Sequence, residues 1–578
     1  MATNYWRSDD VVQIGEKKVE IASENGLSYS GGGKISLFVP PSVKYMSGKD
    51  SFLEFNVKLK LPAGGNLTRL QLDQAGAGTL FRNLRIYDGT RGNLLEEIVD
   101  YANLVILKYD YDADDSLRNK RAMEEGGTAY SQANRGTEGT SKSDLANTMT
   151  NPYVKKISGD QTTDFSDSDF VEAKCCVPIH SGIFSGSIFP VMMSSGLYLE
   201  FDLHEAPRVV KQLDTVKKDR RLRANPFFWA VTLSGAAGTW QPDDVAITVF
   251  YISQVNNISG EDMIAKCPFV VGEKIKFIKK DGTDDSTVPE MTIEALESAG
   301  VVGTTKKIKV TINATANPSA DGVGIDNDYV LYSTSVTAGA YAPTMTISDF
   351  KLVVHQVVLD PKFESGMLAK AREGKAVEFD INTVTTYKNS LLASDTQTTF
   401  HIHANNSRAK SLIVQPTDST AYTSGQLIGS HDQYIITEDA MDHKLRSSRG
   451  GLVGICDGLS SYQMQIDGVL VPSRPVSTKK IATRESIDAF HLFELEKGLD
   501  NADITPRSFR EFMGNFVVSR GFAIGSGAMD LRGKDLAVNL RYEDQPAGVT
   551  AKNKMVNSYV FHVRRLMLRG NGAVEVIV

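Results

Sequence analysis

Cysteine is scarce in this chain. Four cysteines in 578 residues are too few to hold a fold of this length together by disulfide bonds, so a disulfide scaffold is excluded. They are Cys175, Cys176, Cys267 and Cys456. We predict reduced, mostly buried thiols in a protein made in the cytosol. Its Asn-X-Ser/Thr sequons are then expected to stay unglycosylated, because glycosylation needs the secretory route. These sequons begin at Asn66, Asn257, Asn313 and Asn405.

Long apolar runs and a strong excess of one charge are also missing. No run of about 18 apolar residues occurs, so we expect no membrane-spanning helix. Residues 1–13 lack a basic start followed by an apolar stretch, so we expect no signal peptide. The chain has 63 Lys and Arg against 70 Asp and Glu, a net charge of −7. This mild acidity argues against a coat that holds nucleic acid through a basic surface.

The composition is that of an ordinary globular protein, with 41% apolar and 23% charged residues. A length of 578 residues fits two large all-β domains as well as four small domains, because β domains often reach roughly 200–250 residues. Residues 52–61 alternate apolar and polar side chains, which predicts a strand with one buried and one solvated face.

The same alternation predicts many further strands. It recurs at 197–203, 245–255, 350–359, 375–381, 399–404, 536–542 and 558–568. Turn signals such as Asp88-Gly89 and Asp467-Gly468 lie between these runs. Strands separated by turns and long loops, without alternating helices, indicate antiparallel sandwiches.

Helical patterns are few, and two stretches interrupt the strands. We predict helices at 93–109 and 484–499 and a weaker one near 361–373. Residues 111–170 contain only 16 apolar residues in 60, so we expect an external or inter-subunit loop that adds little to a core. Residues 279–345 are predicted as a second insertion with short strands.

Sequence patterns that suggest a binding or catalytic motif do not have the residues that the motif requires at each position. Gly31-Gly32-Gly33-Lys34 lacks the remaining positions of a phosphate loop, so we interpret it as a turn before a strand. The acidic run from Asp110 lacks the glycine and glutamate of a calcium loop and is predicted to be a solvated turn. No serine lies in a G-x-S-x-G elbow.

His401 and His403 lie two residues apart, which places both imidazoles on one face of a strand about 7 Å apart. A metal would need a third ligand that the sequence does not identify, so we predict a polar outer face.

Residues 208–223 carry seven basic and two acidic residues. Contact with an acidic partner, even nucleic acid facing an inner surface, is one interpretation. A solvated loop or subunit contact is favoured, because no aromatic residues interleave to stack bases.

Four blocks of sequence resemble the double jelly-roll major capsid proteins of double-stranded DNA viruses. They are FLEFNVKL at 52–59 with residues 78–104, CCVPIHSGIFSGSIFPVMMSSGLYLEFDL at 175–203, ISDFKLVVHQVVLDPKF at 347–363, and SYQMQIDGVLVPSRPV at 461–476. They follow the order of the family along most of the chain. The likeness is greatest to Polinton-like viruses and virophages, also through CPFVVGEKIKF at 267–277.

This resemblance implies an all-β fold of two consecutive antiparallel jelly rolls with long loop insertions and a few short helices. The first would span 1–362, with insertions at about 110–170 and 279–345, and the second 363–578. It implies a structural protein of the virion, in which homotrimers form pseudo-hexameric capsomers that tile an icosahedral shell. Neighbouring capsomers, penton and minor capsid proteins would be its partners. No enzyme activity, cofactor, metal or sequence-specific nucleic-acid recognition is implied.

Two other classes of function remain open from the residues alone. One is a β-sandwich attachment protein whose loops, rich in Asp, Asn and aromatics, bind a glycan. The other is a glycosidase on a β scaffold with two carboxylates. A stable trimer that forms shells would separate the capsid protein from both.

Overall fold

A computed structural model of the chain describes most, but not all, of its residues. The described residues are 13–60, 68–73, 75–112, 124–126, 170–186, 188–214, 229–232, 249–254, 271, 274–279, 290–302, 305–313, 329–333, 344–373, 375–419, 452–482, 488–505, 515–522, 527–543, 551–569, 572 and 574–577. Among them, no helix is long and apolar enough to span a membrane.

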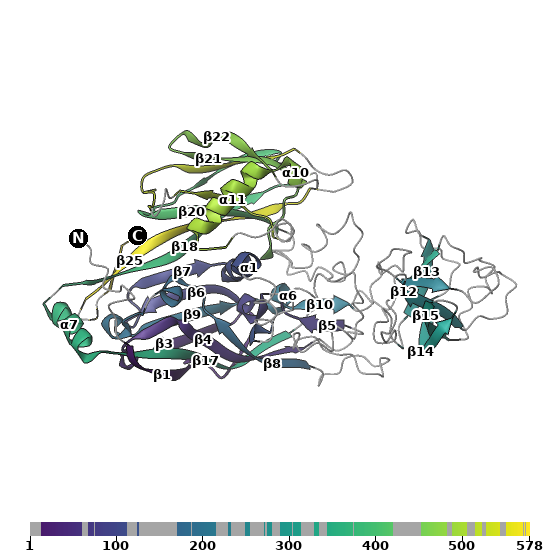
Figure 1. The fold of residues 1–578 in the computed structure, drawn as a ribbon, viewed down its shortest axis with the longest axis horizontal. Helices are drawn as coiled ribbons and strands as arrows, with labels where there is room; N and C mark the ends of the chain where they lie inside the picture. Colours follow the sequence, from purple (N-terminus) through teal and green to yellow (C-terminus); the bar gives the residue numbers. More distant parts are fainter. Residues whose placement is uncertain are drawn as a thin grey trace.

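The first sandwich contains a five-stranded and a four-stranded sheet, which lie in the lower part of Figure 1. Its strands are, in chain order, β1 (Gln13–Ala22) continued by β2 (Ser28–Ser30), β3 (Lys34–Val39), β4 (Met46–Lys60), β6 (Phe81–Asp88), β7 (Leu94–Val99), β8 (Phe170–Pro178), β9 (Leu197–Leu203) and β17 (Thr344–Leu359). One sheet has the order β1-β17-β4-β8, with β2 also beside β17, and the other has the order β3-β9-β6-β7.

The second sandwich repeats this arrangement. Its strands are β18 (Val377–Leu391), β19 (Gln397–Ile402), β20 (Ala409–Asp418), β21 (Leu459–Ile466), β22 (Val469–Ser477), β23 (Val518–Gly521), β24 (Leu536–Tyr542) and β25 (Lys554–Leu568). The sheets have the orders β18-β25-β20-β23 and β19-β24-β21-β22. The short β26 (Val574–Ile577) pairs with the end of β25.

Both sandwiches therefore share one topology. Numbered by position in the chain, with β1 and β2 counted as one strand, each has the order 1-8-3-6 in one sheet and 2-7-4-5 in the other. Eight antiparallel strands in two packed sheets are a jelly roll. The prediction of an all-β chain with two consecutive jelly rolls is confirmed.

Helices lie in the connections between strands. They are α1 (Tyr101–Asp112), α5 (Gly182–Ser185), α6 (Ala206–Val209), α7 (Pro361–Arg372), α10 (Lys479–Ala482) and α11 (Ala489–Asn501), with the 3-10 turns η1 (Pro41–Val43), η2 (Gly76–Leu80) and η3 (Val191–Ser194). The predictions of helices near 361–373 and at 484–499 match α7 and α11. Because α7 lies between β17 and β18, it links the two sandwiches. The domain boundary at 362/363 stays a prediction.

The helix predicted at 93–109 is wrong over its first half. Residues 94–99 form β7, which pairs with β6, and the helix starts at Tyr101. The solvated turn predicted at Asp110 is also wrong, because α1 continues to Asp112 and the Asp110 side chain is buried. Apart from 111–112, 124–126 and 170, the loop predicted at 111–170 lies outside the described residues.

Two additional sheets lie outside the sandwiches, and all their strands except β5 (Thr68–Gln71) fall between β9 and β17 in the chain. β5 pairs with β10 (Lys211–Asp214). A six-stranded sheet contains β11 (Trp229–Thr232), β12 (Val249–Gln254), β13 (Lys274–Lys279), β14 (Met291–Val302), β15 (Thr305–Ile312) and β16 (Tyr329–Ser333). The short strands predicted within 279–345 are thus present, but their sheet also draws on strands before residue 279.

The core of the first sandwich is centred on aromatic side chains. Phe81 lies within ring contact of four others, with centroid distances of 5.0–6.4 Å. These are Phe55, Tyr101, Phe201 and Phe350. Tilted and edge-on rings at such distances stabilise a core beyond the burial of their area. The alternating side chains of β4 that were predicted to be internal, such as Leu53 and Phe55, are fully buried.

Candidate functional site

His401 in β19 and His403 just past its end lie as the alternation predicts. His401 and His403 are exposed, while Phe400, Ile402 and Ala404 between and beside them are buried. His401 Nδ1 lies 2.8 Å from Asp535 Oδ1. Within the described residues, no group of three or more His, Cys, Asp or Glu side chains is placed to hold a metal ion. The absence of a metal site stays a prediction.

Other residues noted in the sequence analysis lie in a turn or are buried to different degrees. The Gly31–Lys34 stretch is a turn between β2 and β3, as predicted; Gly32 has a φ of +77°, and Gly33 N donates to Ser30 O. Cys175 and Cys456 are buried, and burial raises the pKa of the half-buried Cys176 thiol. Cys267 and residues 215–223 of the basic stretch lie outside the described residues.

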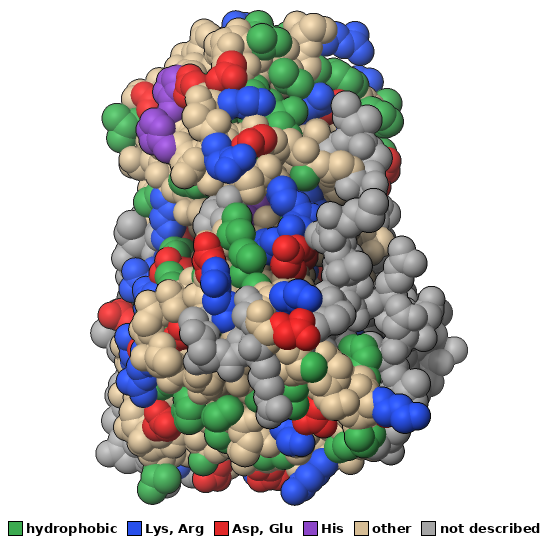
Figure 2. All heavy atoms as spheres, turned by 90° about the vertical axis from the view of Figure 1, so that its left-hand side faces the viewer, with side chains coloured by type: hydrophobic (Ala, Val, Ile, Leu, Met, Phe, Trp, Pro, Cys, Tyr) green, Lys and Arg blue, Asp and Glu red, His purple; other side chains and the backbone are tan. Residues whose placement is uncertain are grey.

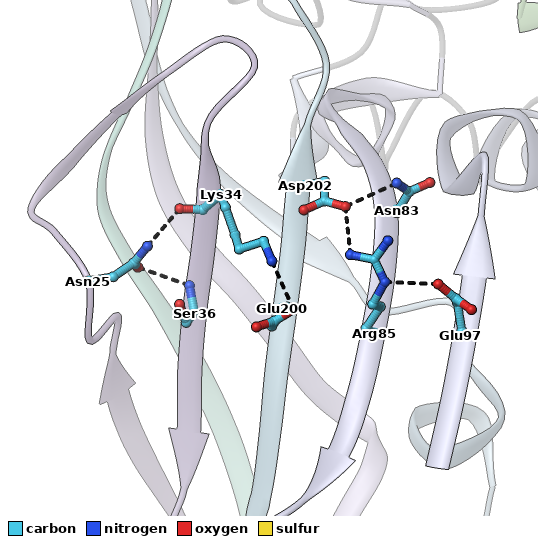
Figure 3. Close-up of polar contacts among 8 residues, drawn as sticks. All are labelled: Asn25, Lys34, Ser36, Asn83, Arg85, Glu97, Glu200 and Asp202. Atoms are coloured by element: carbon cyan, nitrogen blue, oxygen red, sulfur yellow. Dashed lines mark hydrogen bonds and ion pairs between the residues drawn. The ribbon is translucent and has the colours of Figure 1, made fainter. Parts of the chain in front are cut away.

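A ladder of charged side chains crosses the outer face of the sheet β3-β9-β6-β7 (Figure 3). Lys34 Nζ lies 3.1 Å from Glu200 on the next strand. Arg85 on β6 binds Glu97 on β7 at 2.8 Å and Asp202 on β9 at 2.9 Å. The hydrogen bond to Glu97, together with the charge of Asp202, raises the pKa of Arg85. Such partly exposed pairs contribute only about 0–1 kcal/mol each to stability. Their main effect is to fix the alignment of neighbouring strands on a solvated face.

One edge of this sheet is closed by a side chain. Asn25 Nδ2 donates to Lys34 O at 2.7 Å, and Ser36 N donates to Asn25 Oδ1 at 2.9 Å (Figure 3). The amide of Asn25 thus occupies the backbone groups that β3 would offer to a further strand. Closing an edge in this way prevents unwanted strand pairing. The sequence could not reveal this contact, because the alternation of β3 does not show which edge is open.

The opposite edge of the sheet, β7, is covered by the second sandwich. Arg564 Nη1 of β25 donates to Leu95 O at 2.8 Å, and Thr386 Oγ1 of β18 donates to Val99 O at 3.0 Å. Just past β7, Lys388 Nζ lies 2.6 Å from the buried Asp100 carboxylate. Side chains of one jelly roll therefore satisfy backbone carbonyls of the other.

Glu96 lies at the centre of this junction and is fully buried. Its carboxylate accepts hydrogen bonds from Gly182 N at 2.7 Å, Ile183 N at 3.3 Å and Thr383 Oγ1 at 2.7 Å. Burial raises its pKa, and the hydrogen bonds together with the charge of Arg564 oppose that shift. A Cβ at Gly182 would lie 2.4 Å from Asn382 O, so only glycine lets this loop approach β18.

Helix α1 adds a second set of contacts between the sandwiches. Asn515 Nδ2 donates to Asp110 at 2.9 Å, and its Oδ1 accepts from Gln415 and from Gly454 N, each at 2.8 Å. Tyr111 Oη donates to Asn515 O at 2.9 Å. Asn515, Gln415 and Asp110 are buried, so this network links α1 firmly to the second sandwich.

A modest cavity of about 300 Å³ lies beside the break between β1 and β2. Its polar lining includes Glu54, which lies 2.8 Å from Lys174 and 3.0 Å from Lys351. These ion pairs lower the pKa of Glu54, the hydrogen bond from Lys174 most. A carboxylate held ionised between two lysines is poorly suited to take up a proton as a general base. On the face seen in Figure 2, acidic and basic side chains are intermixed over both lobes.

Comparison with known proteins gives matches in structure only. No family model and no curated protein sequence matches the chain. A cryo-EM structure of the Sputnik virophage is similar over 100% of this chain and 91% of that chain, with 10% identity and a TM-score of 0.47. A capsid model of the virus PBCV-1 is similar over 98% and 96%, with 11% identity and a TM-score of 0.46.

The mavirus major capsid protein is similar over 100% of this chain and 94% of that chain, with 12% identity and a TM-score of 0.39. The fold itself is established by the strand orders of the two sheets in each sandwich. The chain is a double jelly-roll protein, and viral capsid proteins are among the solved structures to which it is similar.

Proposed function

We propose that this protein is the major capsid protein of an icosahedral double-stranded DNA virus, a structural block of the virion and not an enzyme. The observation that carries the proposal is the fusion of two jelly rolls with one strand order, packed edge against edge through β7 and β18. The four sequence blocks that resemble the family support it independently.

The geometry fits a hexagonal building block. One chain supplies two similar lobes, which Figure 2 shows one above the other. Three chains around a threefold axis present six lobes, so a trimer can occupy a sixfold position in a shell although it has only threefold symmetry. A permanent contact of this kind is expected to bury well over roughly 2,000 Å² in total. Neighbouring capsomers, penton and minor capsid proteins would be the further partners.

The domain limits belong to the same proposal. The first jelly roll would span 1–362 with its insertions, and the second 363–578. The position of α7 between β17 and β18 supports this division. Apart from Tyr111 and Asp112, which end α1, the loop predicted at 111–170 would lie outside both cores, on the surface or between subunits.

Size-exclusion chromatography with light scattering tests the proposal. We expect a stable species of about three times the chain mass of 63.1 kDa, and shells under negative-stain electron microscopy once assembly is induced. A monomer at micromolar concentration would overturn the proposal. If that monomer bound immobilised glycans, the attachment-protein alternative would replace it.

A further inference from the structure

We propose that a cluster of basic side chains beside the junction of the two sandwiches binds one small oxyanion, with inorganic phosphate as the type ligand. This junction cluster consists of Arg82, His204, Arg208 and Lys388. Its first three members precede β10 in the chain, and Lys388 belongs to β18 of the second sandwich. An anion held there would contact both jelly rolls at once. The site would exist in a single chain, whether or not copies assemble.

The imidazole of His204 is buried, and one of its nitrogens has no partner. The residue is only 2% exposed, and no described group lies within hydrogen-bond reach of its Nε2 atom. Its backbone, by contrast, is engaged: His204 N donates to Leu80 O at 2.9 Å, and His204 O accepts from Gly32 N at 3.1 Å. Buried polar atoms nearly always have a partner, so an exception of this kind indicates a bound water or ion.

A β-bulge places Arg82 beside this strand end. Phe81 pairs with Leu203 and Asn83 pairs with Asp202, so Arg82 is an extra residue of β6 with no counterpart on β9. Its side chain is exposed. Bulges redirect a side chain and are frequent beside functional sites. This bulge lies opposite the end of β9 that leads directly into the buried imidazole.

Lys388 reaches the same place from the second sandwich. Asp100 N donates to Asn83 Oδ1 at 3.3 Å, and Lys388 Nζ lies 2.6 Å from the Asp100 carboxylate. Because Asn83 directly follows Arg82 in β6, these contacts bring the ammonium group to the bulge. The cluster therefore combines groups from both jelly rolls at the point where β7 has just ended.

The charged groups that act on His204 are all basic. Burial, and after it the positive charges of Arg208, Arg82 and Lys388, lower the pKa of His204 to about 3. The ring is therefore neutral, and a neutral imidazole still donates one hydrogen bond. Positive charge around a buried donor favours an anion over a water molecule as the missing partner.

Phosphate fits this set of groups. Guanidinium groups bind phosphate oxygens through charge-assisted hydrogen bonds, often two at a time. Because His204 is almost inaccessible, the ligand must be small, which favours a free oxyanion over the backbone of a nucleic-acid strand. Arg208 is also the first residue of the basic stretch 208–223, for which the capsid role supplies no use.

Equilibrium dialysis with radiolabelled inorganic phosphate, at constant ionic strength in chloride buffer, tests the inference. We expect binding that saturates at one phosphate per chain. Arg82→Gln alters an exposed side chain, so it should keep the far-UV circular dichroism spectrum and weaken binding about tenfold. Arg82→Lys keeps the charge and should recover part of that loss. Arg532→Gln, which removes the same charge from a surface pair with Asp530, is the control and should bind like the wild type.

Two results would overturn the inference. One is binding that does not saturate, or that Arg82→Gln and Arg532→Gln weaken equally, since phosphate would then respond only to overall charge. The other is displacement of the labelled phosphate by a single-stranded oligothymidylate, which would assign the cluster to nucleic acid. The particle mass from light scattering is measured on the same samples. A trimer that binds no phosphate would refute the site and leave the proposed capsid function in place.

Discussion

Three buried histidines should make this protein lose stability in mild acid, before the carboxylates whose pKa is lowered take up protons. His204 and His562 in the two sandwiches and His491 on α11 are nearly inaccessible to solvent. Burial lowers the pKa of each to about 3, from an ordinary value of 6.5. In the native state they stay neutral, whereas in the unfolded chain they bind protons below pH 6.5.

The sign and size of the effect follow from proton linkage. A folded-state pKa below the unfolded value contributes stability that is complete above pH 6.5 and declines as the pH falls toward 3. At pH 5 the unfolded state gains about 2 kcal/mol for each such histidine, so the three together predict a loss of about 6 kcal/mol between pH 7.5 and pH 5. Carboxylates with lowered pKa, such as Asp380, add to the loss only near and below pH 4.

Urea denaturation at pH 7.5, 6.0 and 5.0 measures this loss directly. His491→Phe removes one titrating ring from a site where the imidazole stacks on Phe516 at 6.0 Å and meets Tyr462 edge-on at 5.5 Å. That variant should lose about 2 kcal/mol less than the wild type over the same range. His401→Gln, at an exposed histidine, is the control and should show the full wild-type loss. A free energy of unfolding that stays constant from pH 7.5 to 5.0 would refute the reasoning.

Four further outcomes follow from the contacts described. Asn515→Ala removes the hydrogen bonds that link α1 to the second sandwich and should cost about 2–4 kcal/mol in denaturant unfolding. Phe81→Ala should cost about 3–5 kcal/mol, because the ring fills the centre of an aromatic core. Replacing His401 and His403 together by Gln should shift stability by no more than about 0.5–1 kcal/mol, and a chelator should leave the thermal midpoint unchanged. Deleting 127–169 should leave soluble, folded monomer; loss of all soluble protein would show that the segment belongs to a core.

Strands with one solvated face were predictable from sequence, because the alternation of apolar and polar residues lies within each strand itself. In β4 the side chains Leu53, Phe55 and Val57 alternate with polar ones, and the structure buries the predicted set. The same holds for the exposed His401 of β19 and for His403 just after that strand. The prediction needed no knowledge of which strand lies beside which.

The junction between the sandwiches was not predictable, and the reason is physical. In β7, the consecutive residues Leu95 and Glu96 are both buried, because the second sandwich covers an edge that would otherwise face water. The period of two is lost, and the apolar residues of 94–99 then fit a helical stripe as well as a strand. Asp110 meets Asn515 from 405 residues away, so no local pattern could indicate that this carboxylate is buried.

Two helices in equivalent places differ in burial for the same physical reason. Helix α1 follows the fifth strand of the first sandwich and is buried along most of its length, whereas α11 follows the fifth strand of the second and exposes Phe493. The two helices differ in their neighbours. The second sandwich lies against α1, whereas among the described residues no third sandwich lies against α11. The exposed Phe493 and the buried α1 show that burial of equivalent elements depends on what packs beside them and not on their own sequence pattern.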